Sequence, residues 1–130
     1  MTKTLANTYD DYMENLPQAK VVAEAHADIA KGQVVSIVLL TGVTEAPDAT
    51  DRLGHFGVAL EAISSGERGR FVVDGFAQIT SGGAIAIGQL CDASADMFID
   101  PLSTQTDGNG TFRALEVASG AAALIWCKFL

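Results

Sequence analysis

The distribution of glycine divides this chain of 130 residues into two parts and limits the folds open to it. No glycine occurs before Lys31, whereas all 13 glycines follow it and separate short apolar segments. Glycine permits tight bends and close approach of backbones, and short β-branched segments between such bends are typical of strands. Residues 30–130 are therefore predicted to form an all-β domain, and residues 1–29 a separate N-terminal segment.

The apolar segments after residue 30 predict a series of short strands separated by turns. These strands are expected at residues 34–40, 56–62, 70–80, 85–91, 97–100, 111–118 and 122–130. Gly75, inside the longest of them, predicts a bulge or a close approach of two backbones. Asp107-Gly108-Asn109-Gly110 predicts a tight turn, and the acidic segment from Thr41 to Leu53 an extended loop. Many short strands with regular turn signals favour a small β-barrel or β-sandwich-like domain.

The N-terminal segment contains one pattern of a helix. Four apolar side chains recur at a spacing that places them on one helical face, namely Tyr9, Tyr12, Met13 and Leu16. Thr8 can cap this helix, and Pro17 ends it. A helix of two turns is marginal on its own, so its apolar face needs a surface to lie on. We expect residues 1–29 to be an extended arm that docks on a neighbouring protein; the alternative is an arm that folds back on its own domain.

Charge and hydropathy exclude several classes of partner. The net charge is −8 and the isoelectric point about 4.4, which disfavours binding to nucleic acid or to an anionic membrane. No apolar run approaches the roughly 18 residues of a transmembrane helix, and the first residues do not resemble a secretory signal. The 20 alanines favour a core of small residues or a packed assembly.

No pattern of catalytic or metal-binding residues emerges. His26 and His55 lack the spacing of metal ligands, and the sequence contains neither a Gly-x-Ser-x-Gly turn nor a phosphate-binding loop. Cys91 and Cys127 are expected to be buried, unreactive thiols in a reducing compartment. Three carboxylates, Asp92, Asp96 and Asp100, recur every four residues and are interpreted as an acidic rim exposed to solvent. We therefore predict no catalytic residue, cofactor or metal, and no enzymatic activity.

Several segments between residues 31 and 130 carry a family resemblance. They are Lys31-Gly32-Gln33-Val34-Val35, Phe56-Gly57-Val58-Ala59-Leu60, Gly66-Glu67 with Gly69, Val72-Val73-Asp74-Gly75-Phe76-Ala77, Ile85-x-x-Gly88-x-Leu90-x-Asp92 and the apolar C-terminal strand. In this order and spacing, over about three quarters of the chain, they resemble the phage capsid cement, or head decoration, proteins.

The resemblance implies a β-barrel-like protein without enzymatic activity. It would bind the outer surface of an assembled phage head and stabilise it, commonly as a trimer, after synthesis in the host cytoplasm. Its implied partners are the major capsid protein and further copies of itself. The alternatives are another virion protein, such as a tail-tube or head–tail joining subunit, and a small ligand-binding or enzymatic barrel that uses Cys91 or the three aspartates.

Two groups of residues follow as candidate contacts. The arm residues Tyr9, Tyr12, Met13 and Leu16 are expected to contact the capsid. Trp126 and Phe129, in the C-terminal strand, are expected at an oligomer interface, with the alternative that Trp126 fills the barrel core.

Overall fold

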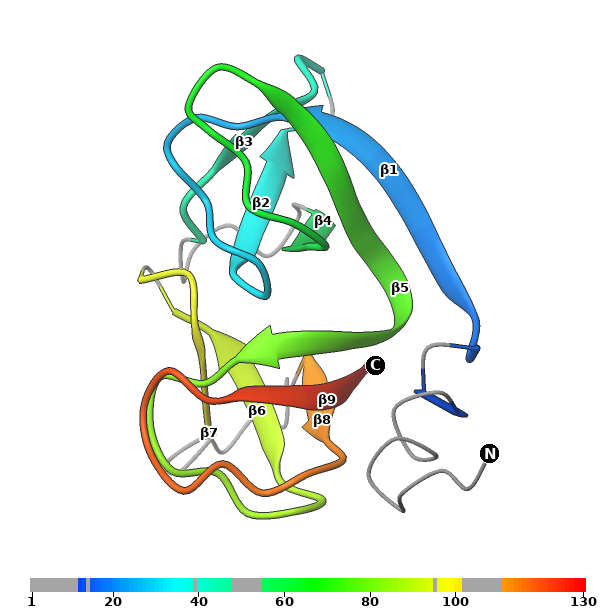
Figure 1. Ribbon diagram of the computed structural model, residues 1–130, viewed down its shortest axis with the longest axis vertical. Helices are drawn as coiled ribbons and strands as arrows, with labels where there is room; N and C mark the ends of the chain where they lie inside the picture. Colours follow the sequence, from blue (N-terminus) through cyan, green and yellow to red (C-terminus); the bar gives the residue numbers. More distant parts are fainter. Residues whose placement is uncertain (1–11, 14, 39, 48–54, 95, 102–110) are drawn as a thin grey trace, which may run out of the picture.

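A computed structural model describes residues 12–13, 15–38, 40–47, 55–94, 96–101 and 111–130 of the chain (Figure 1). The described residues form nine strands. They are β1 (Gln18–Glu24), β2 (Val34–Val38), β3 (Val43–Glu45), β4 (His55–Ala59), β5 (Arg68–Thr80), β6 (Leu90–Ala93), β7 (Ile99–Pro101), β8 (Phe112–Ala114) and β9 (Leu124–Phe129). All nine belong to one sheet in the order β1-β3-β2-β4-β5-β9-β8-β6-β7. The predicted all-β, barrel-like fold is confirmed.

The first half of the sheet closes on itself. β1 pairs with β3 at one end of the order and also runs antiparallel to the first part of β5. The strands β1, β3, β2, β4 and the start of β5 therefore form a ring, which is the upper part of the molecule in Figure 1. We call this ring the first unit.

The second half repeats this arrangement with the later strands. The end of β5 pairs with β9, followed by β8, β6 and β7, and an isolated parallel bridge from Ser81 to Ile99 joins the two ends. β5 is thus the last strand of the first unit and the first strand of the second unit, and it bends between them (Figure 1).

The two units are internal repeats about 56 residues apart, as their strand registers show. Val21 lies opposite Phe71 in the first unit, and Ala77 lies opposite Cys127 in the second. Outside the strands, the antiparallel bridge between Ile29 and Ile63 corresponds to the bridge between Ile85 and Ala118. The sequence analysis did not identify this repeat.

One loop is almost identical in the two units. Ile29-Ala30-Lys31-Gly32-Gln33 precedes β2, and Ile85-Ala86-Ile87-Gly88-Gln89 precedes β6. In each loop the glycine has a positive φ, 85° for Gly32 and 79° for Gly88. In each loop the glutamine Oε1 accepts a hydrogen bond from the alanine amide three residues earlier, at 2.8 Å in the first and 2.9 Å in the second. The glycine allows the left-handed turn, and the glutamine side chain closes it.

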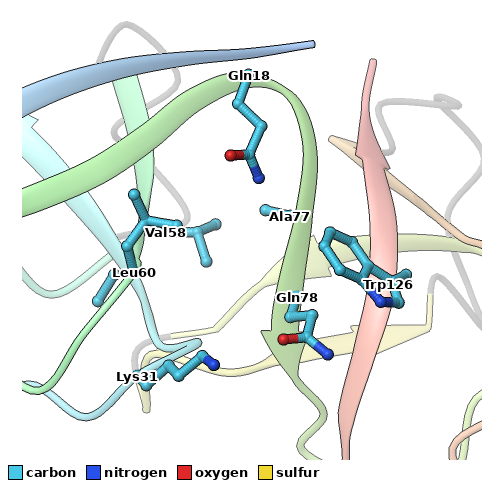
Figure 2. A pocket seen from close by; sticks show the side chains of 8 residues that line it. Gln18, Lys31, Val58, Leu60, Ala77, Gln78 and Trp126 are labelled. Atoms are coloured by element: carbon cyan, nitrogen blue, oxygen red, sulfur yellow. The ribbon is translucent and has the colours of Figure 1, made fainter. Parts of the chain in front are cut away.

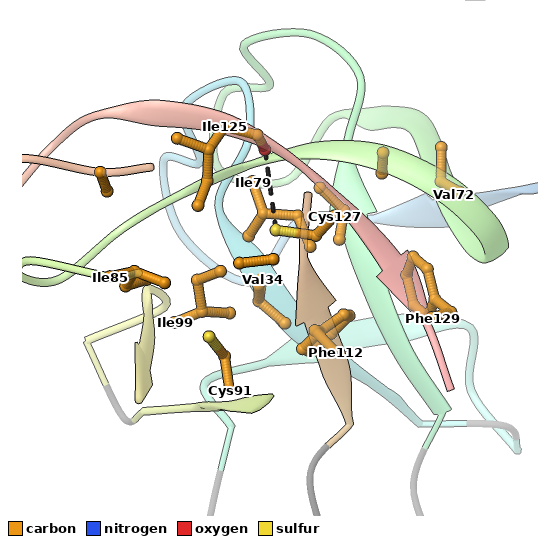
Figure 3. Close-up of a cluster of buried hydrophobic side chains, with 14 residues drawn as sticks. Val34, Val72, Ile79, Ile85, Cys91, Ile99, Phe112, Ile125, Cys127 and Phe129 are labelled. Atoms are coloured by element: carbon orange, nitrogen blue, oxygen red, sulfur yellow. Dashed lines mark hydrogen bonds between the residues drawn. The ribbon is translucent and has the colours of Figure 1, made fainter. Parts of the chain in front are cut away.

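A shared core joins the two units (Figure 3). Its buried members come mostly from the second unit but include three valines of the first, Val34, Val58 and Val72. Phe112 is fully buried in it, and its ring centroid lies 4.8 Å from that of Phe129 and 6.4 Å from that of Phe56 in the first unit. A second cluster lies inside the first unit and consists of Ala23, Ala25, Ile29, Val35, Ile37, Ala59, Ile63 and Phe71. Because the larger core crosses the boundary, the units are not separate domains.

Gly75 lies where β5 passes from one unit to the other. Its φ is 93°, and a Cβ at this position would collide with the carbonyl oxygen of Pro17. The partner strand β1 shifts register between Ala19 and Lys20, opposite this bend. The predicted close approach of backbones at Gly75 is confirmed.

The predicted boundary of the N-terminal arm needs correction. Residues 18–24 form β1, and every residue of β1 lies within the stretch that pairs with the first part of β5. Ala23, Ala25 and Ile29 are buried in the core of the first unit. Residues 18–29 are therefore part of the barrel and not of an arm. The pattern was missed because β1 exposes both faces over much of its length and lacks the alternation that marks a half-buried strand.

The described strands otherwise follow the prediction, with one further addition. β3 lies in the segment that was expected to be a loop, while the tight turn predicted at Asp107–Gly110 lies outside the described residues. The predicted strand 85–91 is instead a bridge at Ile85, the turn around Gly88, and β6 from Leu90 onward.

Candidate functional site

The predicted contact residues of the arm are only partly described. Tyr9 lies outside the described residues. Tyr12 and Met13 are helical, and Asn15 and Leu16 donate backbone hydrogen bonds of 3.2 Å to the carbonyl oxygens of Tyr12 and Met13, so the described part of the predicted helix is a single helical turn. Met13 is only 3% exposed, Leu16 is half-buried, and Tyr12 is 64% exposed. Of the described members of the predicted stripe, Tyr12 offers the largest free surface, and Met13 packs within the chain.

The predicted oligomer contacts both lie inside the chain. Phe129 belongs to the shared core and packs edge-on against Phe112. Trp126 is buried at the junction of the units, where it lies opposite Gln78 and its amide donates to Glu116 Oε1 at 2.8 Å. These positions favour the alternative in which Trp126 fills the interior, because a side chain buried in its own chain has little surface left for a partner.

A small cavity lies at this junction (Figure 2). It has a volume of about 150 Å³ and is lined by Gln18, Lys31, Val58, Ala59, Leu60, Ala77, Gln78 and Trp126. Gln18 Nε2 donates to the carbonyl oxygen of Phe76 at 2.7 Å, so the amide is engaged in the fold. Ligand pockets for small molecules are usually about 300–1,000 Å³. The cavity is therefore a gap between two units and not a pocket for a substrate.

Both cysteines are buried thiols of the second unit. Cys91 and Cys127 are free and fully buried. Burial, aided by the negative charges of Asp100 and Asp92, raises the pKa of Cys91 to about 11. Burial likewise raises the pKa of Cys127. Because the thiolate is the reactive form, neither side chain is suited to act as a nucleophile at neutral pH.

The three aspartates do not form a site together. Asp92 and Asp100 lie opposite each other in β6 and β7, whereas Asp96 is exposed in the turn between them. Asp92 Oδ1 accepts hydrogen bonds of 2.9 Å from Thr111 Oγ1 and from the Ala93 amide. Asp92 therefore ties β6 to the residue before β8.

Neither histidine contributes to a metal or catalytic group in the described part of the chain. His26 Nδ1 lies 2.9 Å from Thr44 Oγ1. The same oxygen accepts a hydrogen bond of 3.2 Å from the His26 backbone amide. The side chain of His55, at the start of β4, is outside the described structure. Among the described residues, no group of three or more His, Cys, Asp or Glu side chains is placed to hold a metal ion. The described residues also contain no helix long and apolar enough to cross a membrane.

What the described surface does offer is a set of exposed apolar side chains. On the first unit these include Val22, which is 60% exposed on β1, and Leu40, which is 99% exposed in the turn before β3. On the second unit they include Ile87, which is 65% exposed, Val117 and Leu130. Sequence reasoning missed Val22 and Ile87. The repeated Ile-Ala-x-Gly-Gln segment was the signal that could have identified Ile87 as the counterpart of Lys31.

The comparisons with known proteins concern the fold. No protein-family model matches the chain, and no curated protein matches it. Among solved structures, the fold resembles that of the N base of the head fiber gp8.5 in bacteriophage phi29, with a TM-score of 0.67. The match covers 88% of this chain and 95% of that chain at 14% sequence identity. At this identity, the fold is what the two proteins share.

Proposed function

We propose that this protein is a non-enzymatic structural component of a phage virion that binds the outer surface of the head and stabilises it. The single observation that carries the proposal is the fold match to a phage head fiber base, which extends over nearly the whole of both chains. The segments that resemble capsid cement proteins support the same location independently of that match. The proposed partners are the major capsid protein and further copies of this chain, arranged as a trimer.

The physical mechanism of such a protein requires no reacting group. A protein that binds the assembled shell and not its free subunits stabilises the shell by mass action, and many bound copies multiply a modest gain per copy. The two units present loops at both ends of an elongated body (Figure 1), which suits contacts to more than one neighbour. The protein would be made in the host cytoplasm and would act on the exterior of the capsid.

Tyr12 is the described arm residue best placed to contact the capsid. Its ring is 64% exposed, and tyrosine is favoured at interfaces because it combines a large apolar area with a polar tip. Tyr9 and Leu16 belong to the same proposed contact. Met13 is buried, so it is expected to anchor the turn that presents Tyr12 instead of touching the capsid directly.

The test is co-sedimentation with empty capsids of the phage that encodes the protein, followed by imaging of the occupied sites. We expect saturable binding on the outer surface and a raised melting temperature of the decorated capsid. Tyr12→Ala should weaken binding about tenfold without changing the melting temperature of the free protein, and Leu40→Ala is the matched control at an exposed apolar residue of the first unit. Absence of binding would contradict the proposal. Spontaneous polymerisation into tubes or stacks would instead favour a tail-tube or joining subunit.

A further inference from the structure

The glycine of the repeated loop is packed against the other unit in one case and exposed in the other, where its carbonyl oxygen accepts a hydrogen bond of 2.9 Å from Arg113 Nη1. In the first unit, Gly32 is buried against the second unit: a Cβ there would collide with Leu124 Cδ1 and would lie 2.8 Å from Thr80 Oγ1 and 3.4 Å from the Gln78 oxygen. In the second unit, the corresponding Gly88 is exposed, and a Cβ there would have no atom within 4 Å. Gly32 therefore packs against a surface of its own chain, whereas in the described part of the chain nothing packs on the exposed side of Gly88.

The surface that receives the first loop is the outer edge of β5. The Thr80 amide donates to the Gly32 carbonyl oxygen at 2.9 Å, and Thr80 Oγ1 donates to the Lys31 carbonyl oxygen at 3.4 Å. Thr80 and Gln78 thus turn their backbone groups away from β9 and toward the loop. In Figure 1 the loop before β2 extends from the upper unit down to this part of β5.

The corresponding edge of the first unit is the outer edge of β1, which among the described residues is unpaired from Gln18 to Ala23. By the repeat, Gln78 corresponds to Val22 and Thr80 to Glu24, because they occupy the same register positions opposite β9 and β5. Glu24 is already engaged, since its amide donates to the Gly42 carbonyl oxygen at 2.9 Å. From Gln18 to Ala23 no described strand pairs with this edge, and Val22 is 60% exposed on it. An unpaired strand edge with an apolar side chain is a ready site for a further segment of chain.

We infer that copies of this protein associate head to tail, with the loop Ala86–Gln89 of one copy docking on the β1 edge of the next, around Val22. The contact resembles the one that the first unit makes with the second within a chain, but it lacks a counterpart of the hydrogen bond from Thr80 to Gly32, because the Glu24 amide already donates to Gly42 and the Gly88 carbonyl oxygen already accepts from Arg113. Ile87, 65% exposed where the first loop has Lys31, adds an apolar side chain suited to Val22. The loop before β6 lies at the lower end of the molecule and β1 runs along the side of the upper unit (Figure 1), so the loop does not reach this edge within one copy.

A head-to-tail contact is heterologous, and such contacts form a ring when the rotation per copy closes. The inference deepens the self-association included in the proposed function by naming the two surfaces. It is tested without a capsid, so a protein that self-associates this way but fails to bind heads would contradict only the proposed function.

The experiment compares Ile87→Asp, Val22→Asp and the control Leu40→Asp by sedimentation equilibrium, with circular dichroism to verify the fold. All three side chains are exposed, so circular dichroism should show the wild-type fold in each variant. The wild type and Leu40→Asp should be oligomers, whereas Ile87→Asp in the loop and Val22→Asp on the edge should be monomers. An equimolar mixture of Ile87→Asp and Val22→Asp should form dimers, because one intact loop can still dock on one intact edge.

Three results would overturn the inference. A monomeric wild type at all accessible concentrations excludes the contact. If Ile87→Asp and Val22→Asp keep the wild-type oligomeric mass, the copies associate through another surface, even if these variants lose capsid binding. A mixture that stays monomeric while each variant is monomeric shows a contact in which both copies use the same surface.

Discussion

The two units have the same topology but reach it with different residues. At two left-handed backbone positions the first unit has Gly42 and Gly66, with φ of 69° and 82°. At the corresponding places the second unit has Met97 and Ala122, with φ of 67° and 62°. An L-residue in this region costs about 1–2 kcal/mol, so the second unit carries strain that the first avoids. The comparison shows that strand register and backbone hydrogen bonds maintain the repeat, while side chains at the turns and in the core vary.

The cores differ as much as the turns. The first unit encloses one fully buried aromatic ring, Phe71, among aliphatic side chains. The second has Phe112 and Phe129 together with two buried thiols, and Cys127 occupies the position that corresponds to Phe71. Three buried valines of the first unit join the second unit's core, whereas the first unit's core receives only the partly buried Met97 from the second. We therefore expect the stability of the whole chain to depend more on the second unit's aromatic cluster.

Removal of the Phe112 ring should have the largest effect on the free energy of unfolding. Phe112→Ala is expected to lower the free energy of unfolding by about 3–5 kcal/mol, because it removes a fully buried ring that contacts both units. Chemical denaturation followed by circular dichroism and by Trp126 fluorescence should show one shared transition at a lower midpoint. Val117→Ala, an exposed change in the same unit, should alter stability by less than about 0.5 kcal/mol. Two separate transitions would contradict a core shared between the units.

Alkaline pH should act on the second unit through its thiols. The pKa of Cys91 rises from an ordinary 9.0 to about 11 in the folded protein, because burial disfavours the thiolate. Above pH 9 the unfolded thiol loses its proton while the native thiol keeps it. The stabilising contribution is thus complete below pH 9 and is lost progressively up to about pH 11.

A variant without thiols isolates this effect from other groups that titrate at high pH. Cys91→Val with Cys127→Val should lose less stability than the wild type between pH 9 and pH 11, as measured by denaturation midpoints at each pH. The wild-type thiols should also fail to react with a thiol reagent at neutral pH until the protein unfolds. Rapid reaction of the native protein would show that the cysteines are accessible and would reopen the enzymatic alternative.

Much of the fold was predictable because glycine and β-branched residues mark local structure. Segments such as Val34–Val38 are rich in β-branched residues and largely buried, and Gly75 has a conformation and a contact that favour glycine. β1 was not predictable in this way, because both of its faces are exposed over much of its length and the alternation of buried and exposed positions is lost. The repeat was detectable from Ile29-Ala30-x-Gly32-Gln33 and Ile85-Ala86-x-Gly88-Gln89, but it required comparison of the chain with itself.

The candidate contacts were less predictable than the fold. Aromatic composition pointed to Trp126 and Phe129, yet register places both inside the chain, where they serve packing. Ile87 and Val22 have no distinguishing local pattern. Their importance follows only from three-dimensional correspondence, because the same loop and the same edge are covered in one unit and exposed in the other.

The smallest expected effect tests the strain difference between the turns. Ala122 has a φ of 62°, and its amide donates to the Ser81 carbonyl oxygen at 2.8 Å. Gly66, its counterpart, donates to the Ala25 carbonyl oxygen at the same distance. Glycine relieves the left-handed strain but loses about 0.4–1 kcal/mol through the greater freedom of the unfolded chain. Ala122→Gly should therefore raise the free energy of unfolding by about 0.5–1 kcal/mol.

The reverse change at the counterpart is the matched control. A Cβ at Gly66 meets no atom within 4 Å, so for Gly66→Ala the left-handed strain, less the entropy that alanine removes from the unfolded chain, should lower the free energy of unfolding by a similar amount. Urea denaturation should show the two midpoints shifted in opposite directions with unchanged slopes. A neutral or destabilising Ala122→Gly would mean that the second unit's turn relieves its strain through contacts of the alanine methyl group. In that case the two turns, despite equal hydrogen bonds, would not be energetically equivalent.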